Sequence, residues 1–337
     1  MLISTPALRA LKKHFAGSKL YLLVAGRVAG ITRDLAYVDK VFVFEPEHPW
    51  LKLLPNLKAI LELRNLEVDL GINMRTMVSD SSAYKIRWIM DLINPGIKAG
   101  RDTVQRGNFL DIKIPENDIG GKYEMEYDID TASALGARVE DKSIDFNIPE
   151  KCSGEVHALL VENGLNPDED ILVAVHPGGR PSRRWPAGNY AGLIKKLSEK
   201  YPVKFVITGG IEEKSLAEKI IRQSGVKALN LCGRLDIYQL AALLKKCALY
   251  ITNDTGVMHI AAFIKTPLVA IFGPGDLKRY DPRNISSKAA VLYKKEHCSP
   301  CNKFSCPSVK CLRSITIEDV VQSAVNFLEP EEGRICE

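Results

Sequence analysis

A loop rich in glycine and arginine follows an apolar run in the second half of the chain. Residues 176–186 are HPGGRPSRRWP, and Gly178 and Gly179 would let a ligand approach the backbone closely. Ser182, Arg183 and Arg184 offer hydrogen-bond donors to a phosphate group. In open α/β sheets, ligands bind outside the carboxyl ends of the strands, which is where this loop falls. The pattern is typical of a phosphate-binding loop, and equally of a tight turn with solvated arginines.

A second loop of this kind, residues 252–259 (TNDTGVMH), also joins a strand to a helix. The N-terminus of a helix presents free N–H groups and the positive end of the helix dipole, which suit a diphosphate. Asp254, Thr255 and Gly256 lie at this start, and His259 follows one turn later. A plain helix cap with a core histidine is the alternative. Two such loops in one domain favour a nucleotide-diphosphate site.

An acidic residue, Glu213, follows the Gly209–Gly210 turn after another apolar run. Its carboxylate could accept hydrogen bonds from ribose hydroxyls. An acid at the start of a helix is also common for structural reasons, because the helix dipole favours it.

Four cysteines lie within fourteen residues near the C-terminus: Cys298, Cys301, Cys306 and Cys311. Four thiolates could bind zinc or an iron–sulfur cluster. The spacing lacks the paired CxxC motifs of a zinc ribbon, so reduced structural cysteines or a surface disulfide are favoured over a structural metal. We predict no metal cofactor.

The elements that must position these residues alternate between apolar runs and amphipathic helices. In the first half we predict a helix capped by Thr5, helices over 50–66 and 123–136, and strands over 19–25, 40–44 and 68–73. A stretch rich in charge, Pro and Gly, 137–170, is the predicted domain linker.

The second half is more regular. We predict strands over 171–175, 203–208, 228–232, 248–252 and 267–272, and helices after Pro186, from about 213, over 236–247 and over 256–264. Asp236 and Gln239 form a capping-box pattern. This alternation predicts a doubly wound parallel sheet, and hence two Rossmann-like domains in an α/β protein.

The length and net charge of the chain limit the number of domains and the kinds of partner. A chain of 337 residues suggests two domains. The net charge of +5 is too small for a polybasic nucleic-acid arm, so nucleic acid is not an expected partner. No apolar run approaches the length of a membrane span, and no signal peptide is evident. We therefore expect a cytoplasmic protein.

In these motifs the chain resembles the family 9 glycosyltransferases, the lipopolysaccharide heptosyltransferases. The resemblance rests on residues 4–12 (STPALRALK), the 176–186 loop, 253–259 (NDTGVMH), 272–276 (FGPGD) and the cysteine cluster. It implies a GT-B fold, two Rossmann-like domains facing a cleft. Residues 1–150 would bind the acceptor and 165–315 the nucleotide sugar, and the helix and tail at 316–337 would pack back toward the N-terminal domain.

The resemblance also implies an activity: inverting, metal-independent transfer of heptose from ADP-heptose to the inner core of lipopolysaccharide. The partners would be the donor, the core acceptor and the cytoplasmic face of the inner membrane. The residues carried over as catalytic are Arg184, in a position where the family usually has Lys, and His259. Those carried over as donor-binding are Gly178, Gly179, Ser182, Glu213, Asp254, Thr255 and Gly256.

One departure concerns the general base. In the family, a strand ending in Gly-Asp precedes the segment that here begins MLISTP, and that Asp is the proposed base. We expect that the start was assigned too late and that Met1 is internal; a true truncation is the alternative. Asp34, Asp69 and Asp80 are only nearby acids. A GT-B enzyme with another nucleotide sugar and glycan acceptor, and a non-catalytic nucleotide-sugar-binding protein, stay open.

Overall fold

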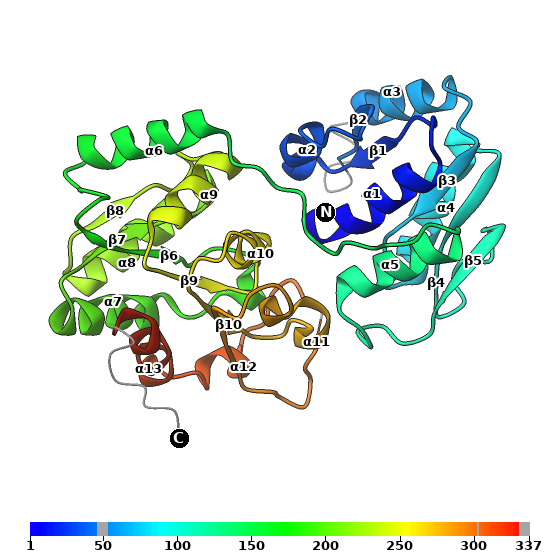
Figure 1. The fold of residues 1–337 in the computed structure, drawn as a ribbon. Coiled ribbons are helices and arrows are strands. Elements are labelled where there is room, and N and C mark those ends of the chain that lie inside the picture. The colour runs from blue at the N-terminus through cyan, green and yellow to red at the C-terminus, as the bar shows by residue number, and fades with distance from the viewer. Residues whose placement is uncertain (46–52, 302, 330–337) are drawn as a thin grey trace. The chain divides into compact units, whose positions relative to one another are not determined.

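The computed structural model describes residues 1–45, 53–301 and 303–329. The chain divides into two compact units, Met1–Phe146 and Asn147–Glu337 (Figure 1). Both units are α/β, and all strand pairs in both are parallel. This confirms the predicted fold class.

The second unit is built on a six-stranded parallel sheet with the order β11–β10–β9–β6–β7–β8 (Figure 1). The strands are β6 (Ile171–His176), β7 (Val203–Ile207), β8 (Ala228–Asn230), β9 (Leu249–Asn253), β10 (Leu268–Phe272) and β11 (Ala289–Tyr293). The central strands are buried on both faces, which is why they appear in the sequence as near-continuous apolar runs.

Helices cover both faces of this sheet. On one face, α7 (Ala187–Lys200), α8 (Lys214–Ser224) and α13 (Ile317–Leu328) share a core with alternate strand residues. On the other face, α6 (Glu150–Glu162), α9 (Ile237–Lys246) and α10 (Gly256–Phe263) form a second core. The short helices α11 (Leu277–Tyr280) and α12 (Lys310–Arg313) lie in the connections. The α13 segment, predicted to pack toward the N-terminal domain, buries its apolar side in the second unit's own core.

The strand order reverses between β6 and β9. The chain moves outward from β6 through β7 to β8, and outward on the other side from β9 through β10 to β11. The connections that leave β6 and β9 therefore lead to helices on opposite faces, α7 and α10. Such a switch point opens a crevice at the carboxyl ends of the two strands, where ligands bind in this class of sheet.

The first unit contains two parallel sheets that do not pair with each other within the described residues. One joins β1 (Tyr21–Val24) to β2 (Lys40–Val43); the other has the order β3 (Leu70–Asn73), β4 (Ile97–Thr103), β5 (Ile112–Glu116). The helices are α1 (Thr5–His14), α2 (Gly26–Arg33), α3 (Leu53–Arg64), α4 (Asp80–Ile93) and α5 (Glu124–Ala134). That this unit lacks an opening strand stays a prediction.

A buried ionic cluster ties β4 to α5 in the first unit. The Arg101 side chain is 1% exposed and donates a hydrogen bond to Glu124 at 2.9 Å and another to Asp128. On neighbouring β5, Glu116 accepts hydrogen bonds from Thr103 and, at 2.7 Å, from Thr76. Burial raises the pKa of Asp128 to about 6, and the positive charge of Arg101 opposes the rise.

Two details of the predicted elements are wrong. Residues 137–170 are not only a linker, because they contain α6, whose buried Cys152, Val156 and Leu160 pack on the sheet. Thr5 does not cap α1 but lies in its first turn, where its hydroxyl donates to the Leu2 carbonyl at 2.8 Å. The capping box at the start of α9 is confirmed.

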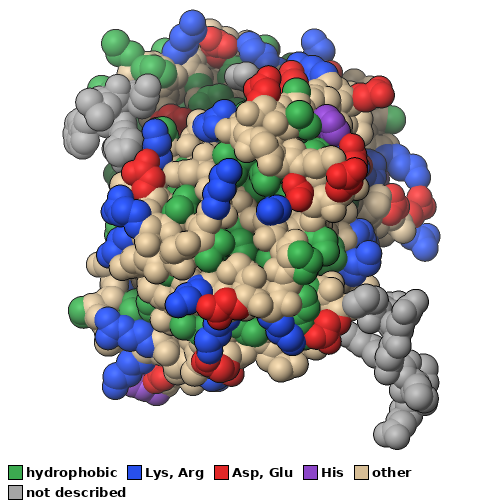
Figure 2. Space-filling view, turned by 90° about the vertical axis from the view of Figure 1, so that its left-hand side faces the viewer, with side chains coloured by type: hydrophobic (Ala, Val, Ile, Leu, Met, Phe, Trp, Pro, Cys, Tyr) green, Lys and Arg blue, Asp and Glu red, His purple; other side chains and the backbone are tan. Residues whose placement is uncertain are grey.

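The surface carries mixed charge. On the face shown in Figure 2, Lys and Arg side chains alternate with Asp and Glu, and hydrophobic side chains lie between them in small groups. Within the described part of the chain, none of the helices combines the length and the apolar character needed to cross a bilayer.

Candidate functional site

Three loops of the second unit meet at the carboxyl edge of its sheet. Residues 176–186 follow β6, residues 208–213 follow β7, and residues 253–256 follow β9. Since β6 lies between β7 and β9 in the sheet, the loop after β6 is flanked by the other two. The structure therefore brings together the three segments that the sequence singled out at the strand-order switch point.

The glycine pair of the first loop is needed for close packing. Gly179 has a φ of +107°, a backbone conformation that side chains disfavour. A Cβ at position 178 would lie 2.3 Å from the carboxylate oxygens of Glu213, so no larger residue fits there without displacing the acid. The close approach of the Glu213 carboxylate explains Gly178, and the positive φ explains Gly179.

Glu213 joins two loops through hydrogen bonds. Its Oε1 accepts the N–H of Gly179 at 2.7 Å, and its Oε2 accepts the N–H of Gly210 at 2.9 Å. Arg184 adds an ion pair at 3.2 Å and donates from Nε to the Gly179 carbonyl at 2.6 Å. The guanidinium is thereby fixed over the first loop. A carboxylate has about four acceptor positions, so a ribose contact from Glu213 stays a prediction.

Ser182 has other partners than the predicted phosphate. Its hydroxyl donates to the Lys303 carbonyl at 2.6 Å, and its N–H donates to the Phe304 carbonyl at 3.2 Å. These bonds join the first loop to the segment of the cysteine cluster. A phosphate contact from the hydroxyl would require the first of them to break.

The third loop places the start of α10 beside the first loop. Thr255 is the N-cap residue but makes no side-chain capping bond. A Cβ at position 179 would lie 2.8 Å from the Thr255 methyl carbon, so the two loops are in contact. The first N–H groups of a helix have no partner within the helix. The start of α10, at Gly256, is therefore suited to an anion held against Gly178 and Gly179.

Asp254 and Arg183 form a second ion pair between the loops. Asp254 is 4% exposed, and its Oδ2 lies 2.8 Å from the guanidinium of Arg183. Burial raises the pKa of this carboxyl, and Arg183 opposes the rise. His259, one turn into α10, is half-buried with its ring edge toward Tyr280, the ring centroids 6.3 Å apart.

Asn253, the last residue of β9, joins the first loop to β9 and α7 through side-chain hydrogen bonds. It was not named as a site residue from the sequence. Its Nδ2 donates to the Gly178 carbonyl at 2.9 Å, and its Oδ1 accepts from the Tyr190 hydroxyl at 2.8 Å and the Trp185 N–H at 3.1 Å. A buried amide with polar partners on both sides is a costly group to misplace. Its sequence signals are its place as the first residue of the 253–259 motif and as the polar last residue of a buried strand.

The chain is similar to known proteins over most of its length. The model of the family "Glycosyltransferase family 9 (heptosyltransferase)" matches residues 122–312, which is more than half of the chain. The chain belongs to glycosyltransferase family 9. The lipooligosaccharide heptosyltransferase 2 of Haemophilus ducreyi is 35% identical over 308 residues, covering 87% of this chain and 84% of the relative.

Two further comparisons extend over nearly the whole glycosyltransferase. The lipooligosaccharide heptosyltransferase 2 of Campylobacter jejuni is 25% identical over 335 residues, covering 97% of this chain and 94% of the relative. The solved structure of ADP-heptose lipopolysaccharide heptosyltransferase II from Escherichia coli has a TM-score of 0.69 at 19% identity, covering 99% and 96%. The latter supports the GT-B fold of this family 9 member.

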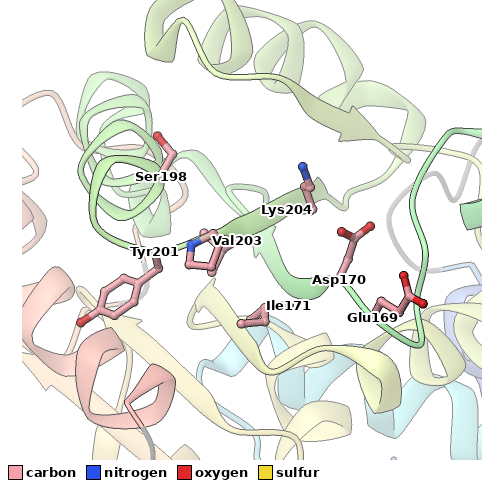
Figure 3. Close-up of a pocket in the computed structure, with 8 residues that line it drawn as sticks. Glu169, Asp170, Ile171, Ser198, Tyr201, Val203 and Lys204 are labelled. Atoms are coloured by element: carbon pink, nitrogen blue, oxygen red, sulfur yellow. The ribbon is translucent and has the colours of Figure 1, made fainter.

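A hollow in the second unit of the glycosyltransferase lies at the opposite edge of the sheet. It has a volume of about 530 Å³. It is lined by residues at the amino-terminal ends of β6 and β7, including Asp170, Tyr201 and Lys204 (Figure 3). Figure 3 shows these side chains spread around the hollow rather than converging on one point. Since ligands in such sheets bind at the carboxyl edge, we assign the chemistry to the three loops.

The cysteine cluster lies beside the first loop. Its thiols are free, and within residues 1–45, 53–301 and 303–329 no group of three or more His, Cys, Asp or Glu side chains is arranged to hold a metal. Hydrogen bonds from the Ser308 hydroxyl and from the backbone of Val309 and Ser308 lower the pKa of Cys306. Elemental analysis of the purified enzyme will decide the prediction that it carries no metal.

Proposed function

We propose that this family 9 glycosyltransferase transfers heptose from ADP-heptose to the inner core of lipopolysaccharide, with inversion and without a metal ion. The relatives named above support the sugar and the glycolipid, since two of them are lipooligosaccharide heptosyltransferases. The observation that carries the proposal is the pair of loops at the β6–β9 switch point, where two glycines, a fixed arginine and a helix N-terminus are adjacent.

The donor would place its diphosphate between the first and third loops. The backbone at Gly178 and Gly179 can approach the phosphates, and the start of α10 at Gly256 offers N–H groups to them. Thr255 adds a hydroxyl, and Glu213 would accept from the ribose. These contacts would hold the leaving group in place before the sugar is attacked.

In the reaction, an acceptor hydroxyl oxygen attacks the anomeric carbon of the heptose. The bond from that carbon to the diphosphate oxygen breaks, ADP leaves, and the configuration at the carbon inverts. Arg184 would neutralise the charge that develops on the diphosphate, as a planar fork rather than the point charge of the usual lysine. His259 and Asp254 would help to hold the donor at the start of α10.

The acceptor proton requires a base. A positioned carboxylate base contributes roughly 10²–10⁴-fold to the rate. Asp34, Asp69 and Asp80 are the acids of the first unit that the sequence offers for this role.

The experiment is a transfer assay with the purified protein. ADP-heptose and other nucleotide sugars are offered with a heptose-deficient lipopolysaccharide core, and nucleotide release and product are measured. Transfer from ADP-heptose alone supports the proposal, and transfer from another donor points to a different GT-B specificity. Donor binding by calorimetry without turnover would contradict the proposed activity and indicate a non-catalytic binding protein.

The nature of the acceptor indicates where in the cell the reaction takes place. A lipopolysaccharide core is lipid-anchored, so we propose that the enzyme works in the cytoplasm, in peripheral contact with the inner membrane. The net charge of +5 is compatible with an anionic glycolipid surface.

A further inference from the structure

The cysteine cluster is a group of nucleophilic side chains that the proposed sugar transfer does not use. Its four thiols are free: Cys298 is exposed, Cys301 and Cys306 are partly exposed, and Cys311 is buried. The other cysteines of the described residues are all buried. Within the described part of the chain, the thiols that a solute can reach are therefore confined to this one segment.

The turn that follows Cys306 favours the deprotonated form of this cysteine. The Ser308 hydroxyl lies 3.4 Å from the Cys306 sulfur, the N–H groups of Val309 and Ser308 donate to it, and these hydrogen bonds lower the pKa of the thiol. Val309 has a φ of +35°, which is rare for a β-branched residue. The turn thus holds an unfavourable backbone conformation in which its N–H groups meet the sulfur. Oxidants react with the thiolate rather than with the thiol, so Cys306 is prepared for oxidation.

The cluster brings further thiols close to Cys306. Burial raises the pKa of Cys311, at the start of α12, and negative charge on Cys298, Cys301 and Cys306 raises it further. Because a Coulomb interaction weakens with distance, these interactions mean that the other three sulfurs lie around Cys311. A thiolate beside a second thiol is the arrangement of a redox-sensitive cysteine with a resolving cysteine.

The backbone of the cluster is hydrogen-bonded to the candidate donor site. The Ser182 hydroxyl donates to the Lys303 carbonyl at 2.6 Å, and the Ser182 N–H donates to the Phe304 carbonyl at 3.2 Å. The N–H of Cys301 donates to the Pro274 carbonyl, in the loop after β10, at 2.8 Å. A change in the path of the cluster segment must therefore break these bonds or move the first loop.

We propose that the cysteine cluster is a redox-modification site, at which hydrogen peroxide oxidises Cys306 and a second thiol of the cluster then closes a disulfide with it. In the first step the Cys306 thiolate attacks one peroxide oxygen, the O–O bond breaks, and hydroxide leaves and takes a proton from the solvent. The sulfur is now a sulfenic acid. In the second step the other cysteine gives up its proton and its sulfur attacks the sulfenic sulfur. The S–O bond breaks, and the hydroxide takes that proton and leaves as water.

The disulfide weakens nucleotide binding at the first loop. It shifts the backbone of the cluster segment, so the carbonyls of Lys303 and Phe304 no longer hold Ser182 where the reduced protein holds it. Reduction by a dithiol supplies two electrons and restores both thiols. This effect on the nucleotide rests on the proposed donor site, whereas the oxidation of the cluster does not.

The test treats the full chain with hydrogen peroxide, maps disulfides by mass spectrometry of unreduced peptides, and measures ADP binding by calorimetry. We expect one disulfide that joins Cys306 to another cysteine of the cluster. ADP should then bind at least about fivefold more weakly, which corresponds to the loss of about one hydrogen bond. Dithiothreitol should reverse both changes. If the reduced protein does not bind ADP, the proposed donor site fails, and the disulfide map still decides whether the cluster is oxidised.

Two variants assign the reaction to the cluster. Cys306→Ser should form no disulfide and should bind ADP equally before and after peroxide. Cys152→Ser, which removes a buried thiol of α6, is the matched control and should respond to peroxide as the parent does. Circular dichroism verifies the fold of each variant. The proposal is overturned by thiols that stay reduced in the parent, by a disulfide that omits Cys306, or by unchanged ADP binding in the oxidised parent. A metal ion bound in stoichiometric amount to the purified protein would also overturn it, because the thiolates would then be ligands.

Discussion

Asn253 shows how much of the site depends on a residue that need not touch the substrate. Its amide holds Gly178 of the first loop on one side and Trp185 and Tyr190 on the other. Asn253→Asp keeps the acceptor but turns the donor toward Gly178 into a second acceptor and buries a charge. We expect it to lose about 2–3 kcal/mol of stability and to raise the donor KM.

The graded control for this variant is Tyr190→Phe, which removes only one of the hydrogen bonds and should cost about 1 kcal/mol. Urea unfolding gives the stabilities, and initial rates give the donor KM. If Asn253→Asp is destabilised but binds the donor as before, the residue serves the core and not the loops.

A substitution of Arg184 should affect the rate of the chemical step. Because the guanidinium would counter charge that grows on the leaving diphosphate, Arg184→Ala should lower kcat by about 10²-fold, with a smaller effect on KM. Arg184→Lys restores the charge without the fork and should lie between the two. Arg222→Ala, on the exposed surface of α8, is the control. An effect confined to KM would mean that Arg184 only binds the donor.

At the scale of elements, the Arg101 cluster joins β4 to α5 through charges that water does not reach. Arg101→Met leaves Asp128 and Glu124 without their buried cation, so we expect a loss of about 3–5 kcal/mol at pH 8. Urea unfolding followed by circular dichroism measures it, with exposed Arg138→Met as the control.

The loss of stability in Arg101→Met should become smaller as the pH falls. Burial already raises the pKa of Asp128 to about 6, and removing Arg101 removes the charge that opposes the rise. The folded variant then binds protons that the unfolded chain, with carboxyl pKa values near 4, does not bind above about pH 5. Since stability rises with falling pH wherever the folded state binds more protons, the deficit at pH 5.5 should be smaller than at pH 8. Equal deficits at both pH values would rule out this account of the cluster.

The same element explains what sequence reasoning could and could not predict. The central strands of the second unit are buried on both faces, so their near-continuous apolar runs identified them. The edge strand β11 is only partly buried and was not predicted. β4 was missed because its sequence, IKAGRDT, contains the charged residues Arg101 and Asp102, and the charge of Arg101 is neutralised only by tertiary partners. α6 was taken for linker because Pro149 and Gly154 suggested a loop. The site loops were predicted, but the pairing of Arg183 with Asp254, 71 positions apart, is invisible to local patterns.

At the scale of the whole molecule, the two units should respond differently to nucleotide. The candidate donor loops all belong to the second unit, whereas the buried ionic cluster belongs to the first. ADP at about 100 times its dissociation constant stabilises the state that binds it by about 2.7 kcal/mol. Hydrogen exchange should therefore slow in residues 176–186, 208–213 and 253–259, most at the first amides of α10. Residues 53–93 should exchange as before. Protection of the first unit by ADP alone would show that the nucleotide binds elsewhere than at the β6–β9 switch point.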